Sequence, residues 1–148
     1  HAFYLNLGLE SLHVRMPRHC ENGQAVAEFL ASHPKVEHVT YCGLPGDKYY
    51  ELGQKYLPNG SCGVVSFELK GGRDAAQRFM AGLQIFAIET HVADARSCCL
   101  CPSTTTHRQM TEEQLQAAGI AAGLVRMSCG LESKEDLIAD VAHALENI

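Results

Sequence analysis

The sequence has no tryptophan, and aromatic residues make up only 7% of its 148 positions. It has no apolar run of the roughly 18 residues that a membrane-spanning helix needs. Basic residues are few, with 12 Lys and Arg against 17 Asp and Glu, and they form no stripe. These absences argue against a membrane partner and against nucleic acid as a partner.

Familiar catalytic signatures are also missing. The sequence contains no phosphate-binding Lys loop, no G-x-G-x-x-G after a strand, no H-E-x-x-H and no G-x-S-x-G. Its eight His are scattered, so their spacing indicates no metal site. Gly71 and Gly72 precede a predicted helix, where free amides can bind phosphate. An ordinary turn between strand and helix explains this glycine pair equally well.

The seven cysteines are odd in number and irregularly spaced, and no secretory signal accompanies them. This pattern predicts reduced thiols and a cytoplasmic location rather than a disulfide framework. The cluster 98–101 contains one C-x-x-C, which is half of a zinc site or a redox pair. No second ligand pair stands at metal spacing. We therefore interpret Cys98, Cys99 and Cys101 as small buried residues of a strand.

The length and composition predict one globular domain over residues 1–148. Hydrophobic residues make up 46% of the chain and charged residues 20%, which is typical of a folded domain with its own core. The first residue is His1 rather than Met, and the chain starts within an apolar run. We therefore expect the chain to be a piece of a longer protein.

Strands and helices alternate along the chain. Apolar residues at helical spacing predict helices over 21–32, which Pro34 ends, over 47–57 with Asp47 as N-cap, and over 73–83. Thr111-Glu-Glu-Gln114 predicts a capping box at the start of a short helix that ends near Gly119. Ser133-Lys-Glu-Asp136 resembles a capping box and precedes a last helix that carries Leu137, Val141 and Leu145. Alternating or β-branched segments predict strands over 36–41, 63–69, 85–92, 96–101 and 125–129. Segment 2–14 fits either type. The order predicts an α+β (α/β layered) fold, with helices covering one small sheet.

Arg126 lies within the predicted strand 125–129, between residues that favour burial. An unpaired buried charge is very costly, so this guanidinium needs a partner. Its planar, forked shape suits a carboxylate held by two parallel hydrogen bonds. The partner is either an Asp or Glu of this chain or the carboxylate of a ligand.

Two loops carry further polar groups. Residues 102–107 (Pro-Ser-Thr-Thr-Thr-His) directly follow a predicted strand and are dense in hydroxyls. They form either part of a site or a solvated turn before the next helix. Asp94 follows another predicted strand, where it can cap a turn.

Several motifs in one order resemble the Cys/Met-metabolism family of pyridoxal-phosphate enzymes. They are Gly43-Leu-Pro, the segment 63–73, His91-Val-Ala-Asp-Ala-Arg-Ser97, the segment 102–107 and the segment 125–132. The similarity runs over essentially the whole chain. The Ser-Phe-Glu-Leu-Lys-Gly-Gly stretch and the Asp-Ala-Arg-Ser order resemble the O-acetylhomoserine sulfhydrylase branch most. Related cystathionine synthases, cystathionine lyases and methionine lyases are the alternative branches.

The resemblance implies a C-terminal small domain of a fold-type I (aspartate aminotransferase-like) enzyme. In that family the larger, preceding domain binds pyridoxal phosphate and supplies the lysine that holds it covalently. None of the five lysines here has the sequence setting of that residue. The resemblance therefore implies no catalytic residue and no bound cofactor in this piece, which is expected to be inactive alone.

The same resemblance implies three substrate-binding residues. Arg126 matches the arginine that holds the substrate α-carboxylate, and His91 matches a position beside it that is usually Asn or Ser. Thr105 belongs to the retained part of the Thr-rich loop. Two positions differ from the residues usual in the family: Ala93 stands where Gly is usual, and Cys101, just before the Thr-rich loop, stands where His is usual. These differences leave the fine geometry of the loops open.

The implied partners are an amino-acid substrate, the missing N-terminal domain and further copies of the protein, because relatives are tetramers. We expect exposed apolar surface around Phe3, Tyr4, Leu5 and Leu7, where that domain is missing. An alternative from another functional class is that the chain is an independent small-molecule-binding module without catalysis.

Overall fold

The computed structural model describes residues 1–148 and contains one mixed five-stranded sheet in the order β1-β2-β5-β4-β3. The strands are β1 (Val36–Thr40), β2 (Val64–Leu69), β3 (Ala87–Ile88), β4 (Cys98–Leu100) and β5 (Leu124–Ser128). The first four strands in this order pair antiparallel, and β3 joins β4 in parallel. β5 therefore lies at the centre of the sheet.

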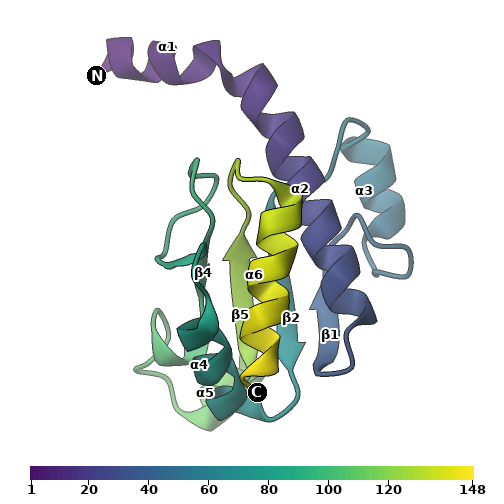
Figure 1. Cartoon of the computed structure of the whole chain (residues 1–148), viewed down its shortest axis with the longest axis vertical. Coiled ribbons are helices and arrows are strands. Elements are labelled where there is room, and N and C mark those ends of the chain that lie inside the picture. Colours follow the sequence, from purple (N-terminus) through teal and green to yellow (C-terminus); the bar gives the residue numbers. More distant parts are fainter.

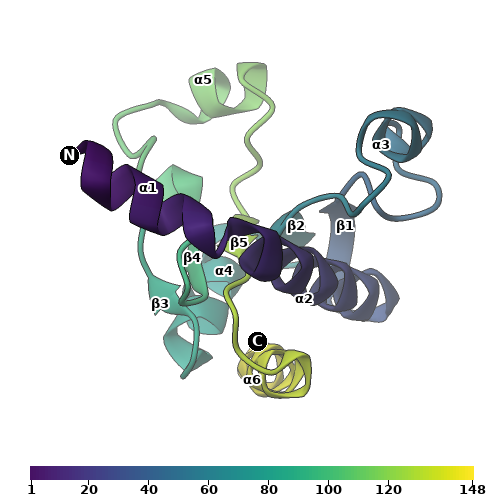
Figure 2. The ribbon, with the colours of Figure 1, turned by 90° about the horizontal axis from the view of Figure 1, so that it is seen from above.

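The chain has six α-helices, five of which lie around the sheet, whereas the first projects away from it (Figure 1). They are α1 (Ala2–Glu10), α2 (Leu12–Ser32), α3 (Tyr50–Tyr56), α4 (Gly72–Gly82), α5 (Glu112–Ala117) and α6 (Lys134–Glu146). A short 3-10 helix spans Pro102–Thr104. Figure 2 shows α6 on one side of the sheet and α5 on the other. The predicted α+β class, with helices over one small sheet, is confirmed.

The core lies between one face of the sheet and the helices α2, α4 and α6. In β2 the side chains of Val65, Phe67 and Leu69 are buried, as their alternation predicts. The rings of Phe67 and Phe79 meet edge to face with centroids 5.5 Å apart. This arrangement buries the apolar face of α4 against the middle of the sheet.

Helix α2 begins much earlier than predicted. It starts at Leu12 rather than at residue 21, and it contains Pro17. The first buried residue of α2 is His19, so the preceding turns pack against little. An apolar stripe marks only the part of a helix that packs, and the sequence therefore revealed only the second half.

Two other boundaries were wrong. Helix α3 starts at Tyr50, and Asp47 is not its N-cap, because its carboxylate accepts the amides of Tyr41 and Tyr49. The predicted strand 85–92 shrinks to β3. Asp140 accepts the amides of residues 84, 85 and 86 at 2.7, 2.9 and 3.2 Å, so these amides cannot join the sheet.

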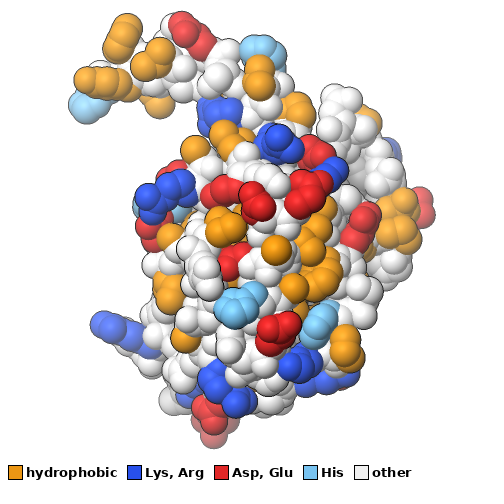
Figure 3. Space-filling model, in the orientation of Figure 1, with side chains coloured by type: hydrophobic (Ala, Val, Ile, Leu, Met, Phe, Trp, Pro, Cys, Tyr) orange, Lys and Arg blue, Asp and Glu red, His pale blue; other side chains and the backbone are white.

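Helix α1 projects away from the sheet (Figure 1) and carries no buried residue. Phe3, Tyr4 and Leu5 are 72%, 73% and 71% exposed. Figure 3 shows hydrophobic side chains on the surface of the projecting arm. The expected exposed apolar surface is confirmed. Segment 2–14 is helical, as α1 and the start of α2 with a break at Ser11. None of the helices combines the length and apolarity that a membrane span requires.

Candidate functional site

Arg126 occupies the middle of β5, opposite Ser66 of β2 and Leu100 of β4. Its strand neighbours Val125 and Met127 are fully buried in the core. Successive side chains of a strand point to opposite faces, so Arg126 lies on the face away from the core. The sequence was right to place it in a strand, but it belongs to the polar face of that strand.

The guanidinium of Arg126 has no acidic partner in the structure. Its Nη2 donates to the backbone carbonyls of Thr90 at 3.1 Å and of His91 at 3.4 Å. Its Nε is buried and has no hydrogen-bond partner. No Asp or Glu forms an ion pair with it. The alternative that an Asp or Glu of this chain pairs with Arg126 is therefore wrong. The Nε–H group of Arg126 is a donor that no acceptor in this chain satisfies.

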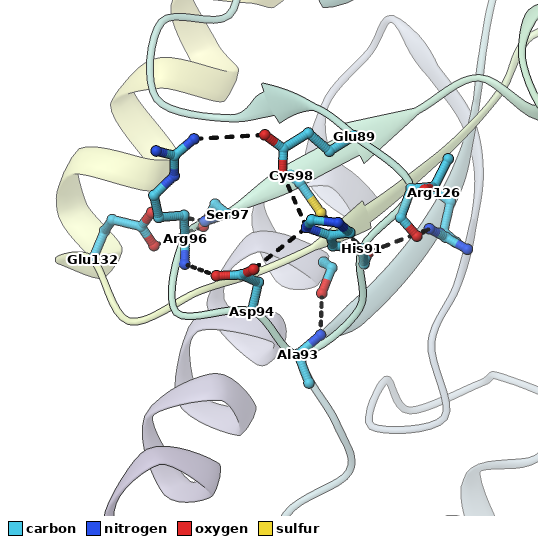
Figure 4. A network of polar contacts seen from close by, with 11 residues as sticks. Glu89, His91, Ala93, Asp94, Arg96, Ser97, Cys98, Arg126 and Glu132 are labelled. Atoms are coloured by element: carbon cyan, nitrogen blue, oxygen red, sulfur yellow. Dashed lines mark hydrogen bonds and ion pairs between the residues drawn. The ribbon is translucent and has the colours of Figure 1, made fainter. Parts of the chain in front are cut away.

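The two carbonyls belong to the loop 89–97, which links β3 to β4 (Figure 4). In this loop the Nδ1 atom of His91 lies 3.2 Å from a carboxylate oxygen of Glu89 and 3.4 Å from one of Asp94. Arg96 also approaches Glu89, at 3.5 Å. The backbone amide of Arg96 lowers the pKa of Asp94, and His91 adds to this effect. Asp94 thus caps a turn, as predicted.

The end of the loop is tied to the turn that follows β5. Ser97 donates its amide and its hydroxyl to the carboxylate of Glu132, at 2.7 and 2.8 Å. The Ser97 hydroxyl also accepts the amide of Gly130 at 2.7 Å. Asn22 of α2 donates to the carbonyls of Gly130 and Glu132. Sequence reasoning missed this network. The one signal for it was an acidic residue soon after a buried strand.

The cysteine cluster 98–101 is buried, and one of its members contacts the loop that binds Arg126. Cys98, Cys99 and Cys101 are buried, which confirms their interpretation as small core residues. The Sγ of Cys98 donates to the His91 carbonyl at 3.2 Å. Burial raises the pKa of the Cys98 thiol, although the charge of Arg126 opposes this. No group of three His, Cys, Asp or Glu side chains is arranged to hold a metal ion.

Thr105 is not part of the Arg126 network. The hydroxyls of Thr104 and Thr105 donate to the carbonyl of Cys101, at 3.2 and 2.8 Å. Thr106 and His107 pair with each other at 2.8 Å. The hydroxyls of the loop 102–107 thus largely satisfy the loop itself. Of the three predicted substrate-binding residues, the structure brings together Arg126 and His91.

The residues present fit the recognition of an amino-acid carboxylate better than the holding of a cofactor. Arg126 offers a buried donor without a partner. None of the five lysines forms a hydrogen bond or an ion pair with the residues around Arg126, where a lysine would be needed to hold the cofactor. Lys35, Lys70 and Lys134 bind backbone carbonyls or Glu21, and Lys48 and Lys55 lie over tyrosine rings.

Three curated relatives have similar sequence identity to this chain. The chain is 43% identical over 148 residues to an O-acetyl-L-homoserine sulfhydrylase from Leptospira meyeri, covering 99% of the chain and 34% of the relative. It is 42% identical to a homocysteine synthase from Schizosaccharomyces pombe, with coverage of 98% and 34%. It is 43% identical to an L-methionine gamma-lyase from Pseudomonas putida, with coverage of 98% and 36%. The chain therefore spans about a third of the length of these relatives.

A solved structure and a family model agree with these relatives. The crystal structure of a putative O-acetylhomoserine (thiol)-lyase from Campylobacter jejuni matches 95% of this chain with a TM-score of 0.88 and 41% identity, over 33% of its own length. The model of the Cys/Met metabolism PLP-dependent enzymes matches residues 1–146. This match covers nearly the whole chain, and the chain belongs to the family of Cys/Met metabolism PLP-dependent enzymes.

Proposed function

We propose that this chain is the substrate-carboxylate-binding domain of an O-acetylhomoserine sulfhydrylase, and that Arg126 binds the α-carboxylate of the amino acid. One observation carries this proposal: a guanidinium in the central strand has no acidic partner and keeps a buried Nε without an acceptor. A carboxylate accepting from Nε and from one Nη nitrogen meets this unmet need.

The backbone prepares Arg126 for this role. Two carbonyls of the loop 89–97 hold Nη2, which limits the rotation of a long and flexible side chain. Less conformational entropy is then lost when a ligand binds. The carboxylate, once bound, fixes the position and orientation of the Cα atom, which is a proximity contribution to catalysis.

His91 helps Arg126 in this proposal by holding the two acids of the loop in place. Glu89 and Asp94 lie near the site and would repel an incoming carboxylate. The guanidinium of Arg96, 3.5 Å from Glu89, reduces that repulsion. The Nδ1 atom of His91 contacts both acids and keeps their carboxylates on its own side.

Pyridoxal phosphate, when bound in the complete enzyme, supplies an electron sink for negative charge at the carbon atoms of the amino acid. In our proposal, residues of a larger N-terminal domain hold the cofactor. The isolated 148-residue chain is then inactive, and the complete protein is a homo-oligomer that places this domain against the substrate.

The reaction proposed for the complete protein converts O-acetyl-L-homoserine and sulfide into homocysteine and acetate. The motifs around residues 66–72 and 94–97 support the sulfhydrylase, as do two of the relatives. An L-methionine gamma-lyase is the second candidate, since relatives of that name reach the same identity. Assaying the complete protein with sulfide and either O-acetyl- or O-succinyl-homoserine, and separately with methionine alone, distinguishes these activities.

Arg126→Lys tests the carboxylate assignment. Lysine keeps the charge but loses the forked pair of donors, so KM for the amino-acid substrate should rise about 10-fold to 100-fold. Arg78→Lys is the matched control, because Arg78 is exposed on α4 and has no recorded partner. Equal KM values for both variants would show that Arg126 does not bind the carboxylate. A complete protein without any pyridoxal-phosphate activity would favour an independent binding module.

A further inference from the structure

The loop 89–97 contains the one residue other than glycine with a positive φ angle. Ala93 has a φ of 58°, in the left-handed region. A side chain with a Cβ atom adopts this conformation at a cost, so surrounding contacts must hold it. The Ala93 amide donates to the hydroxyl oxygen of Ser128 at 3.0 Å, and Ser128 is only 2% exposed. A buried side chain of the sheet thus holds the strained turn.

Ser128 and Arg126 are two residues apart in β5, so their side chains lie on the same face of the sheet. Both bind the same loop. Arg126 binds the carbonyls of Thr90 and His91, and Ser128 binds the amide of Ala93. Figure 4 shows the contacts of Arg126 and Ala93 on neighbouring parts of this loop. The loop is therefore fixed to β5 at two points, on either side of Val92.

We propose that Ser128 is a positioning residue for Arg126, acting through the left-handed turn at Ala93. If Ala93 relaxed to a negative φ, the direction of the chain would change and the two carbonyls would leave the Nη2 atom. Cys98 donates to only one of these carbonyls, so it cannot keep both in place. The functional consequence rests on the proposed role of Arg126, whereas the structural coupling does not.

The coupling is tested first in the 148-residue chain by NMR. Ser128→Ala removes the acceptor, and we expect hydrogen exchange of the Ala93 amide to accelerate at least about tenfold. The Nε–H signal of Arg126 should shift and broaden. Glycine adopts positive φ without strain, so adding Ala93→Gly to Ser128→Ala should restore that signal. An unchanged Arg126 signal in Ser128→Ala overturns the proposal.

Two further variants keep this test decisive. Ser66→Ala is the matched control, because Ser66 lies opposite Arg126 on the same sheet and its hydroxyl makes no hydrogen bond. It should leave the signals of residues 93 and 126 unchanged. If Ser128→Ala does not fold, Ser128→Cys replaces it, since the thiol sulfur is only a weak acceptor and the side chain keeps the same number of heavy atoms. An effect in Ser66→Ala as large as in Ser128→Ala also overturns the proposal.

Kinetics of the complete enzyme with pyridoxal phosphate separates this inference from the proposed function. Ser128→Ala should raise KM for the amino-acid substrate about fivefold to tenfold and leave kcat within about twofold. Adding Ala93→Gly should return KM to within about threefold of the wild type. If Arg126→Lys raises KM and Ser128→Ala does not, positioning is wrong and the proposed function stands. If Arg126→Lys has no effect while the NMR coupling holds, the proposed function is wrong and positioning stands.

Discussion

The two faces of the sheet differ in burial and in the kind of contacts that their side chains make. On the covered face, Phe67, Val125 and Met127 contact the helices and are almost completely buried. On the other face, Ser66 and Arg126 are half-buried, and the contacts of Arg126 come from a loop about 35 residues away. The first face stabilises the fold. The second leaves a charged group free for a ligand, which is where we place function.

The largest difference between the faces should appear on truncation of a core ring. Phe67→Ala removes a fully buried ring that packs against Phe79, and it should lower the free energy of unfolding by about 3–5 kcal/mol. Ser66→Ala, one residue earlier and on the other face, should change it by less than about 0.5 kcal/mol. Urea denaturation measures both. Similar losses in the two variants would contradict the division between the faces.

At alkaline pH, the thiols on the two faces should contribute differently to the loss of stability. Cys99 pairs with Met127 in the sheet and so shares its covered face, whereas Cys98 pairs with Ser128. Burial raises the pKa of Cys99 to about 12, against roughly 8.5 in an unfolded chain. Between these values the unfolded state loses the thiol proton and the folded state keeps it. Stability is therefore complete below about pH 8.5 and falls as the pH rises towards about 12.

One such thiol contributes about 1.4 kcal/mol per pH unit to this loss. Cys129, whose pKa burial also raises to about 12, contributes in the same direction. Urea denaturation at several pH values between about 9.5 and 11.5, under reducing conditions, measures the slope. Cys99→Ala should make the slope shallower by about 1.4 kcal/mol per pH unit, and Cys98→Ala should change it less. A slope unaltered by Cys99→Ala would show that this thiol ionises in the folded state.

Local patterns made the covered face predictable. The alternation in β2 correctly assigned its buried residues, and Pro34 correctly ended α2, whose last residue is Ser32. Thr111 forms the expected capping box with Gln114. In the analogous motif, Ser133 accepts the amide of Asp136, but the return bond is missing. These features depend on residues within four positions of one another, so a single sequence reveals them.

The other face depends on contacts between distant residues, which the sequence does not reveal. One such contact also lies on the covered side, where Asp140 of α6 holds the amides before β3 over a separation of 54 to 56 residues. Ser128 reaches Ala93 over 35 residues. The family resemblance selected Arg126 and His91, but it did not reveal that the loop beside them contains a strained alanine. Long-range hydrogen bonds and backbone angles therefore account for most of what was missed.

Only a small effect on stability is expected at the residue with the largest proposed effect on function. Arg126→Met keeps much of the apolar side-chain stem and removes a buried Nε that lacks a partner. The variant loses two hydrogen bonds from Nη2, but it also loses the cost of burying an unmet donor. These contributions oppose each other, so the free energy of unfolding should change by less than about 1 kcal/mol. Urea denaturation beside Phe67→Ala checks this, and a loss of about 3 kcal/mol or more would make Arg126 a structural residue rather than one kept for a ligand.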